Sequence, residues 1–166
     1  MPTETARRKL AIVAREPLPE NLFRSVVAHA PLVAIDLVVQ DRQRRVLLGW
    51  RRNPPARGYW FVPGGRVRKD ETLAEAFARI STAELGETFQ LEHSIFMGIY
   101  QHFYSENFRG EARASTHYIT LAHKLLANDT CLPLPDEQHS RYRWASRTDI
   151  ECDLLVHPYA RAYFRG

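Results

Sequence analysis

The sequence predicts a single domain of the α/β class. Apolar, β-branched runs typical of strands occur on both sides of a segment whose apolar residues recur at helical spacing, and a glycine pair separates the two patterns. A chain of 166 residues can form one domain with a proper core and leaves no room for a second folded domain. No stretch approaches the roughly 20 apolar residues that a membrane span needs.

The first half of the chain predicts a helix, a β-hairpin and a loop. Apolar residues at helical spacing are followed by an apolar strand, a polar turn and a second strand. In order, the segments are a helix over Glu20 to Ala30, strands over Pro31 to Gln40 and Val46 to Arg51, and a loop over Asn53 to Gly58. The helix residues expected to face the core are Leu22, Phe23, Val26 and Val27.

The second half predicts a strand, a glycine turn and a helix, followed by further strands. The segments are strands over Tyr59 to Val62, Ser94 to Tyr104, Thr116 to Leu126 and Arg141 to Ala145, with helices over Thr72 to Leu85 and His157 to Phe164. Gly64 and Gly65 allow the chain to turn tightly before the first of these helices. Its inward residues are expected to be Leu73, Ala76, Phe77 and Ile80.

Composition indicates a globular protein with an acidic small-molecule partner. Hydrophobic residues make up 45% and charged residues 25%, which is ordinary for a globular domain. The net charge is +4, and arginine, whose guanidinium group suits phosphate oxygens, is far commoner than lysine. Because the basic residues are scattered, we expect a small diphosphate ligand and no nucleic-acid or membrane partner.

The N-terminal residues are expected to form a separate segment. Residues 1 to 16 predict a basic, loosely ordered arm, and residues 17 to 166 the folded domain. The short apolar run in the arm is too short for a secretory signal. Cys131 and Cys152 could form one disulfide, but so low a cysteine density favours reduced thiols and a cytoplasmic location.

The stretch from Gly64 to Gly86 carries the most specific motif. Five residues separate Gly65 from Glu71, and seven separate Glu71 from Arg79. Four residues separate Arg79 from Glu84, and one separates Glu84 from Gly86. This spacing resembles the Nudix box of a superfamily of diphosphate hydrolases. The resemblance implies the Nudix fold, in which a mixed β-sheet is sandwiched between α-helices. Further glutamates usual in that box are replaced here by Ile80 and Ala83.

Two longer motifs narrow the resemblance within that superfamily. The segments Gly58 to Val67, Lys69 to Leu73 and Leu134 to His139 are similar to GDP-mannose mannosyl hydrolases, over nearly the whole chain. That family cleaves the carbon–oxygen bond of the sugar and shares the broken box. The resemblance implies hydrolysis of GDP-mannose, with GDP-glucose as a possible second substrate, by a homodimer that uses magnesium.

The resemblance also implies a metal site with one ion. Its protein ligands would be the Glu84 carboxylate, the Gly64 carbonyl and the Gln138 amide, with Mn²⁺ able to replace Mg²⁺. Magnesium prefers such oxygen donors and keeps several waters. Glu71 is interpreted as structural, because helical spacing need not place it beside Glu84. Arg79 would order the acids.

The catalytic and substrate-binding residues follow from the same resemblance. His139 would be the general base, and His102 is the alternative; a histidine can accept a proton from water near neutral pH. The residues implied to hold the substrate are Phe23 at the base, Arg51 and Arg66 at the diphosphate, Tyr118 at the leaving group, and Asp36 at the sugar. Asp36 also stands out on its own, since a charged residue within an apolar strand needs a partner or a cleft.

The missing acids bear on the reaction. Attack at phosphorus usually needs several metal ions, whereas one ion can stabilise a diphosphate that leaves when water attacks the anomeric carbon with inversion. Two alternatives remain: a nucleotide-sugar pyrophosphohydrolase that cleaves the diphosphate, and a Nudix module that binds a nucleotide sugar without turnover.

Overall fold

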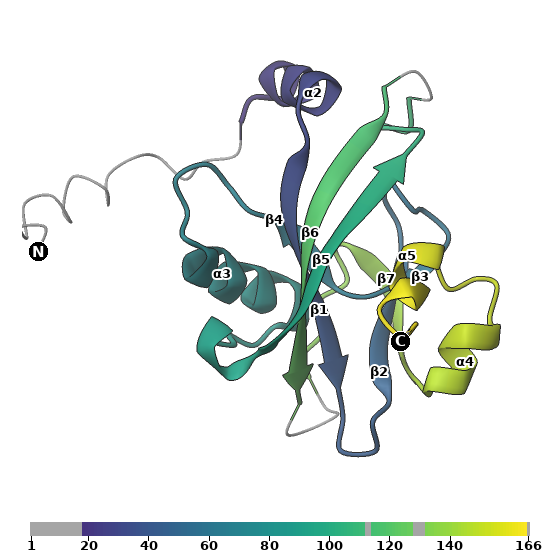
Figure 1. Ribbon diagram of the computed structural model, residues 1–166. Coiled ribbons are helices and arrows are strands. Elements are labelled where there is room, and N and C mark those ends of the chain that lie inside the picture. The colour runs from purple at the N-terminus through teal and green to yellow at the C-terminus, as the bar shows by residue number, and fades with distance from the viewer. Residues whose placement is uncertain (1–17, 112–113, 128–131, 166) are drawn as a thin grey trace, which may run out of the picture.

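The computed structural model describes residues 18–111, 114–127 and 132–165, so the expected N-terminal arm and Cys131 lie outside the described residues. A mixed β-sheet fills the middle of the molecule (Figure 1). Helix α3 (Leu73–Leu85) covers one face, while α4 (Arg147–Cys152) and α5 (Pro158–Ala162) cover the other. The predicted α/β sandwich is therefore confirmed.

The sheet is built around its longest buried strand. β1 (Leu32–Gln40) pairs in parallel with β6 (Thr116–Leu126), which pairs antiparallel with β5 (Ile95–Tyr104). On its other side β1 pairs with β4 (Gly64–Arg66), and it meets β2 (Val46–Arg51) only between Gln40 and Val46. The remaining strands, β3 (Trp60–Phe61) and β7 (His139–Ala145), flank β2. The sheet therefore divides between β1 and β2.

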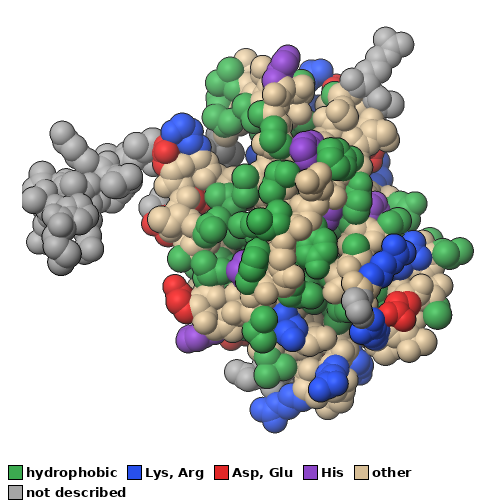
Figure 2. Space-filling view, in the orientation of Figure 1, with side chains coloured by type: hydrophobic (Ala, Val, Ile, Leu, Met, Phe, Trp, Pro, Cys, Tyr) green, Lys and Arg blue, Asp and Glu red, His purple; other side chains and the backbone are tan. Residues whose placement is uncertain are grey.

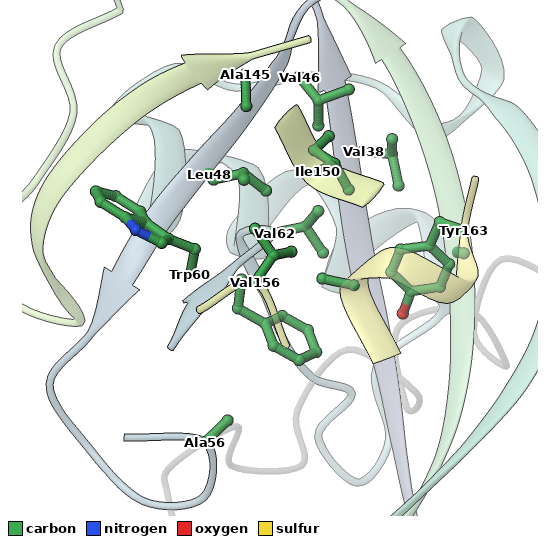
Figure 3. Packing of buried hydrophobic residues seen from close by; sticks show 13 residues of the cluster. Val38, Val46, Leu48, Ala56, Trp60, Val62, Ala145, Ile150, Val156 and Tyr163 are labelled. Atoms are coloured by element: carbon green, nitrogen blue, oxygen red, sulfur yellow. The ribbon is translucent and has the colours of Figure 1, made fainter. Parts of the chain in front are cut away.

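β1 is buried on both faces because helices cover both sides of the sheet. Ile35, Leu37 and Val39 pack towards α3, while Val38 packs towards α4 and α5. Figure 3 shows the second cluster, in which Ile150 of α4 and other apolar side chains from strands and loops come together. Alternate residues of one strand thus build two cores.

Helix α3 has strong local signals at both ends. The Thr72 side chain accepts a hydrogen bond from the Glu75 N–H, and the Glu75 side chain binds back to the Thr72 N–H, which completes a capping box. Gly86 ends the helix with φ 70°, a left-handed conformation that glycine adopts without strain. These signals fix the helix that carries Arg79 and Glu84.

Several elements differ from the sequence prediction. Helix α2 (Glu20–His29) forms, but Leu22 and Val26 are exposed and only Val27 of the four expected residues is buried. Leu73 is exposed as well. The sequence predicted neither β4 nor α4, nor the short 3₁₀-helix η1 (Leu91–His93). Figure 2 shows hydrophobic side chains gathered on the face seen in Figure 1, and no described helix is long and apolar enough to cross a membrane.

Candidate active site

A pocket opens where the sheet divides between β1 and β2. Its walls come from all six strands from β1 to β6 and from the loop that contains Pro55 and Ala56. Six of the residues predicted to act at the site line it: Asp36, Arg51, Gly64, Arg66, His102 and Tyr118. Strands that lie far apart in the sequence thus bring most of the predicted substrate residues together.

Gly64 is positioned by an alternation of hydrogen bonds between β1 and β4. The Val67 N–H donates to Val33 and the Leu37 N–H to Pro63, so the Asp36–Gly64 pair between them is a non-hydrogen-bonded pair. The Gly64 N–H and C=O therefore both point away from β1. A Cβ at Gly64 would lie 2.5 Å from Asp36 Oδ1, which explains why this position has no side chain.

Asp36 takes part in a buried chain of hydrogen bonds at the back of the pocket. The Tyr163 hydroxyl of the C-terminal segment donates to Asp36 Oδ2 at 2.5 Å and lies 3.3 Å from His102 Nε2. The other ring nitrogen of His102 lies 3.3 Å from Thr120 Oγ1. Burial raises the pKa of Asp36 to about 7, although Tyr163 and Arg51 oppose the shift. Burial lowers the pKa of His102 to about 4, so this ring is neutral at pH 7.

Glu84 and His139 form a second buried pair beside the pocket. Glu84 Oε2 lies 3.6 Å from His139 Nδ1 and has no hydrogen-bond partner among the described residues. Burial raises the pKa of Glu84 to about 7, while a hydrogen bond from the Gly64 N–H and the charge of Arg51 oppose the shift. Burial and then Arg51 lower the pKa of His139 to about 3. His139 is therefore neutral at pH 7, and the contact is not an ion pair.

The His139 side chain has no exposed surface, because it packs on a glycine of the neighbouring strand. A Cβ at Gly49 would lie 2.4 Å from His139 Cγ, and the strand pairing shifts register between Gly49 and Arg51. His139 Nε2 is buried without a partner among the described residues. His139 does not line the pocket in this arrangement, whereas His102 does.

Glu71 and Arg79 brace the loop that precedes α3. Arg79 Nε donates to Glu71 Oε1 at 2.6 Å, and a terminal nitrogen of Arg79 donates to Glu71 Oε2 at 2.8 Å. Arg79 also donates to the Arg66 carbonyl, and Glu71 accepts the Arg68 N–H. The Arg79 hydrogen bonds hold the pKa of Glu71 below its usual value. Arg79 therefore orders Glu71 and the backbone beside the pocket.

The arginines place positive charge along the pocket wall. Arg51 lies near enough to Asp36, Glu84 and His139 to shift the pKa of each. The guanidinium carbon of Arg66 lies 3.8 Å from the ring centroid of Phe23 in α2. Phe23, which does not line the pocket itself, is thereby linked to its rim.

The sequence of this chain matches a known protein family. The model of the NUDIX domain matches residues 30–165. The chain belongs to the Nudix hydrolase family. It is also 40% identical over 146 residues to the low-salt glycan biosynthesis protein Agl8 of Haloferax volcanii, a match that covers 88% of each chain.

Solved Nudix structures share the fold at low sequence identity. The MutT protein from Methanosarcina mazei is 22% identical with a TM-score of 0.65, over 82% of this chain and 92% of that chain. The MutT NUDIX hydrolase from Burkholderia pseudomallei is also 22% identical with a TM-score of 0.65, over 81% and 96%. The NUDIX domain of Shewanella oneidensis NrtR, solved with ADP ribose, is 19% identical with a TM-score of 0.59, over 89% and 97%.

Nudix proteins generally use a divalent metal ion such as Mg²⁺, and two groups beside the pocket offer oxygen atoms to such an ion. Glu84 offers a buried oxygen that no other described residue binds, and the Gly64 backbone beside it points away from β1. Within the described residues, no three His, Cys, Asp or Glu side chains are grouped to hold a metal. Ile80, where the Nudix box commonly has an acid, is buried in the core 3.1 Å from a Cβ built on Gly65.

The structure leaves one predicted metal ligand exposed and adds residues that the sequence did not reveal. Gln138 is exposed, and its backbone carbonyl accepts a hydrogen bond from the Arg52 N–H at 3.2 Å. Its neighbour Glu137 lies near enough to raise the pKa of Glu84. The unpredicted polar residues of the Nudix pocket are Tyr104 and Thr120 in its wall, Tyr163 behind Asp36, and Glu137 at the metal side. Of these, only Glu137 had a signal, its position directly before Gln138.

Proposed function

We propose that this Nudix protein hydrolyses GDP-mannose to GDP and free hexose, with GDP-glucose as a possible second substrate. Water attacks the anomeric carbon from the face opposite the diphosphate, the carbon–oxygen bond breaks, and GDP leaves with the bonding electrons. The water proton passes to a histidine, and the configuration of the sugar inverts.

The observation that carries this proposal is the pair formed by Glu84 and Ile80. Glu84 has a buried oxygen without a hydrogen-bond partner in the described part of the chain, whereas Ile80 packs as core beneath Gly65. Attack at phosphorus usually draws on several ions held by a cluster of acids. An aliphatic side chain in place of an acid argues for one ion, and hence for attack at carbon.

The residues of the pocket suit the two ends of a nucleotide sugar. Arg51 and Arg66 line one part of the pocket and can bind diphosphate oxygens. Asp36, His102 and Thr120 line it as well and can bind hydroxyl groups of the hexose. A pocket that carries both kinds of group fits a sugar diphosphate better than a free nucleotide.

Mg²⁺ held by Glu84, the Gly64 carbonyl and Gln138 would supply charge neutralisation to the departing diphosphate. Arg51 and Arg66 would add fixed positive charge at the same group. Arg79 supports the site by holding Glu71 and the Arg66 carbonyl.

The general base in this proposal is His139, and His102 is the alternative. Both rings are neutral at pH 7, as a base must be. His139 can reach water only if the loop before it moves, since its side chain has no exposed surface. His102 lines the pocket, but both of its nitrogens already face a hydroxyl group. The two histidine variants therefore decide the assignment.

The relationship to the Haloferax volcanii protein supports a nucleotide-sugar substrate. That relative is named for low-salt glycan biosynthesis, and glycans are assembled from activated sugars. We place the reaction in the cytoplasm, where reduced cysteines persist; Cys152 has no disulfide partner within the described residues.

The test is hydrolysis of GDP-mannose with Mg²⁺ in ¹⁸O-labelled water, followed by mass spectrometry of both products. Label in free mannose with unlabelled GDP is expected. GMP and mannose phosphate, with label on phosphorus, would instead identify a pyrophosphohydrolase. Measurable binding without any product would identify a nucleotide-sugar-binding module, and either result would overturn the proposal.

A further inference from the structure

Two adjoining grooves lie at the end of the sheet that is far from the pocket. Both are lined by Gln40 at the end of β1, by Arg44 in the turn that follows it, and by Lys124 of β6. They enclose about 420 Å³ and 440 Å³, which is within the range of clefts that bind small molecules. Gln40 lies four residues beyond Asp36 on β1, so the grooves begin about 13 Å from the pocket, at about 3.3 Å per residue.

The fold gathers cations at these grooves that are scattered in the sequence. Arg42 and Arg44 belong to the turn between β1 and β2, whereas Lys124 comes from a strand in the second half of the chain. Figure 2 shows Lys and Arg side chains at the lower end of the molecule, where Figure 1 places this turn. None of the three side chains forms an ion pair or a hydrogen bond with another described residue. We call the part of the grooves lined by Arg42, Arg44 and Lys124 the basic recess.

The other charged residues of the grooves are already paired with one another. Asp41 accepts hydrogen bonds from the Arg45 N–H at 2.8 Å and from Arg45 Nε at 2.7 Å. Burial opposes the ionisation of Asp41, but these bonds hold its pKa below the usual value, so the carboxylate is charged and matched by Arg45. On the far side of the first groove, Arg147 pairs with Glu151 at 2.7 Å. These pairs leave the positive charge of the basic recess without compensation among the described residues.

Arg44 occupies a backbone conformation that does not favour arginine. Its φ is 63°, in the left-handed region, which glycine and asparagine adopt more easily than a residue with a long side chain. The Arg44 N–H donates to the Asp41 carbonyl at 3.0 Å, which holds the turn in this form. Asparagine would therefore suit the turn better than arginine does. An arginine at a strained position indicates that its side chain serves a purpose other than the stability of the turn.

We propose that the basic recess binds a phosphate-bearing anion at a site separate from the pocket. The planar guanidinium groups of Arg42 and Arg44 can each bind two phosphate oxygens, and Lys124 adds a compact positive charge. Ile95 and Leu126 line the second groove and are 58% and 61% exposed, so they offer apolar contact to the organic part of such a ligand. Two sources share this chemistry: a free phosphorylated molecule and the phosphate headgroup of a lipid. The proposal does not depend on the reaction in the pocket.

Two-dimensional NMR of the ¹⁵N-labelled full chain, titrated with inorganic triphosphate at constant ionic strength without Mg²⁺, tests the free anion. The amide signals of Gln40, Arg44 and Lys124 should shift and saturate with a Kd of their own, whatever happens at the pocket. Lys124→Gln and Arg44→Asn should each raise this Kd by about 10-fold or more, because each removes a charged partner of the anion. Lys69→Gln is the matched control, since it removes the same charge from a side chain that is 83% exposed on the loop before α3. It should leave the Kd unchanged.

Co-sedimentation with vesicles of about three parts phosphatidylcholine to one part phosphatidylglycerol tests the lipid headgroup. Triphosphate shifts at the basic recess would assign the site to a free anion. Vesicle binding that Lys124→Gln abolishes, without triphosphate shifts, would assign it to a headgroup. Arg44→Asn should melt at a temperature no lower than that of the unaltered protein, so its weaker binding would not reflect lost folding. The proposal is overturned if neither probe acts at the basic recess, or if Lys69→Gln weakens binding as much as Lys124→Gln does.

Discussion

Replacing Glu84 with glutamine is expected to stabilise the metal-free protein at pH 8 while abolishing its response to magnesium. The Glu84 side chain is 8% exposed, and Oε2 has no hydrogen-bond partner among the described residues. At pH 8 the folded protein must hold this carboxylate charged against the effect of burial. Glutamine has a similar shape and carries no charge.

The size of this effect follows from the pKa of Glu84. Burial raises it from 4.5 to about 7, and each pKa unit corresponds to about 1.4 kcal/mol, so the penalty at pH 8 is at most about 3 kcal/mol. Between pH 4.5 and 7 the folded protein binds a proton that the unfolded chain has lost, and stability therefore falls as pH rises. We expect Glu84→Gln to be about 1–3 kcal/mol more stable than the unaltered protein at pH 8, with the difference approaching zero at pH 4.5.

Urea unfolding of both proteins at several pH values, with EDTA and with Mg²⁺, measures these differences. Mg²⁺ should stabilise the unaltered protein, because a ligand that binds only the folded state shifts the unfolding equilibrium. It should not stabilise Glu84→Gln. A variant that is less stable than the unaltered protein at pH 8 would refute the reasoning, as would an equal response to Mg²⁺.

Glu71→Gln is the matched control on the same motif. Arg79 and the Arg68 N–H hold the pKa of Glu71 below its usual value, so its charge stabilises the fold. Removing that charge should therefore destabilise the protein at pH 8, by about 1.5–3 kcal/mol for a charged hydrogen bond. Opposite signs for the two glutamates would show that the effect depends on each environment and not on net charge.

Three further predictions concern the pocket. If His139 is the base, His139→Gln should lower kcat by about 100-fold with little change in KM, as measured by steady-state kinetics. The same result for His102→Gln instead would give the role to His102. Tyr163→Phe should raise the Kd for GDP-mannose by roughly 10-fold through loss of the hydrogen bond to Asp36. Its affinity for GDP, measured by calorimetry, should not change, and Tyr159→Phe is the control. Equal weakening for GDP would contradict the assignment of Asp36 to the sugar. Burial lowers the pKa of His102 from 6.5 to about 4. Between these pH values the unfolded chain binds a proton that the folded protein does not, so stability falls as pH drops through this window. His102→Gln should lose that pH dependence in urea titrations, and an unchanged slope of stability against pH would contradict the prediction.

The sequence predicted the elements whose signals are local. Helix α3 has both helical periodicity and a capping box, and β5 and β6 are long runs of strand-forming residues. β4 has only three residues, so it shows no periodicity. α4 has six residues and begins with a capping box between Ser146 and Asp149, a local signal that the periodicity reading did not use. Leu22 was assigned inward from periodicity alone, and the exposed position of α2 could not be deduced that way.

The site was predicted from the Nudix-box motif and from Asp36, a charged residue within an apolar strand. Asp36 was recognised as an acid in an apolar strand, and it does line the pocket. Its partner Tyr163 lies 127 residues away in the chain, so no local pattern could link the two. The burial of His139 depends on its packing against Gly49 and on a register shift between β2 and β7, and the sequence alone specifies neither arrangement.

Ile80 connects the fold of this protein with its chemistry. Its side chain is 1% exposed and packs with Ile35, Phe77 and other residues beneath the glycine turn. An acid at this position would have to charge inside an apolar cluster, which is unfavourable without a bound cation. The aliphatic residue therefore stabilises the turn without metal and at the same time removes a ligand from the site. A Nudix chain that gains core packing in this way has fewer charges to stabilise attack at phosphorus, which favours a reaction in which the diphosphate leaves intact.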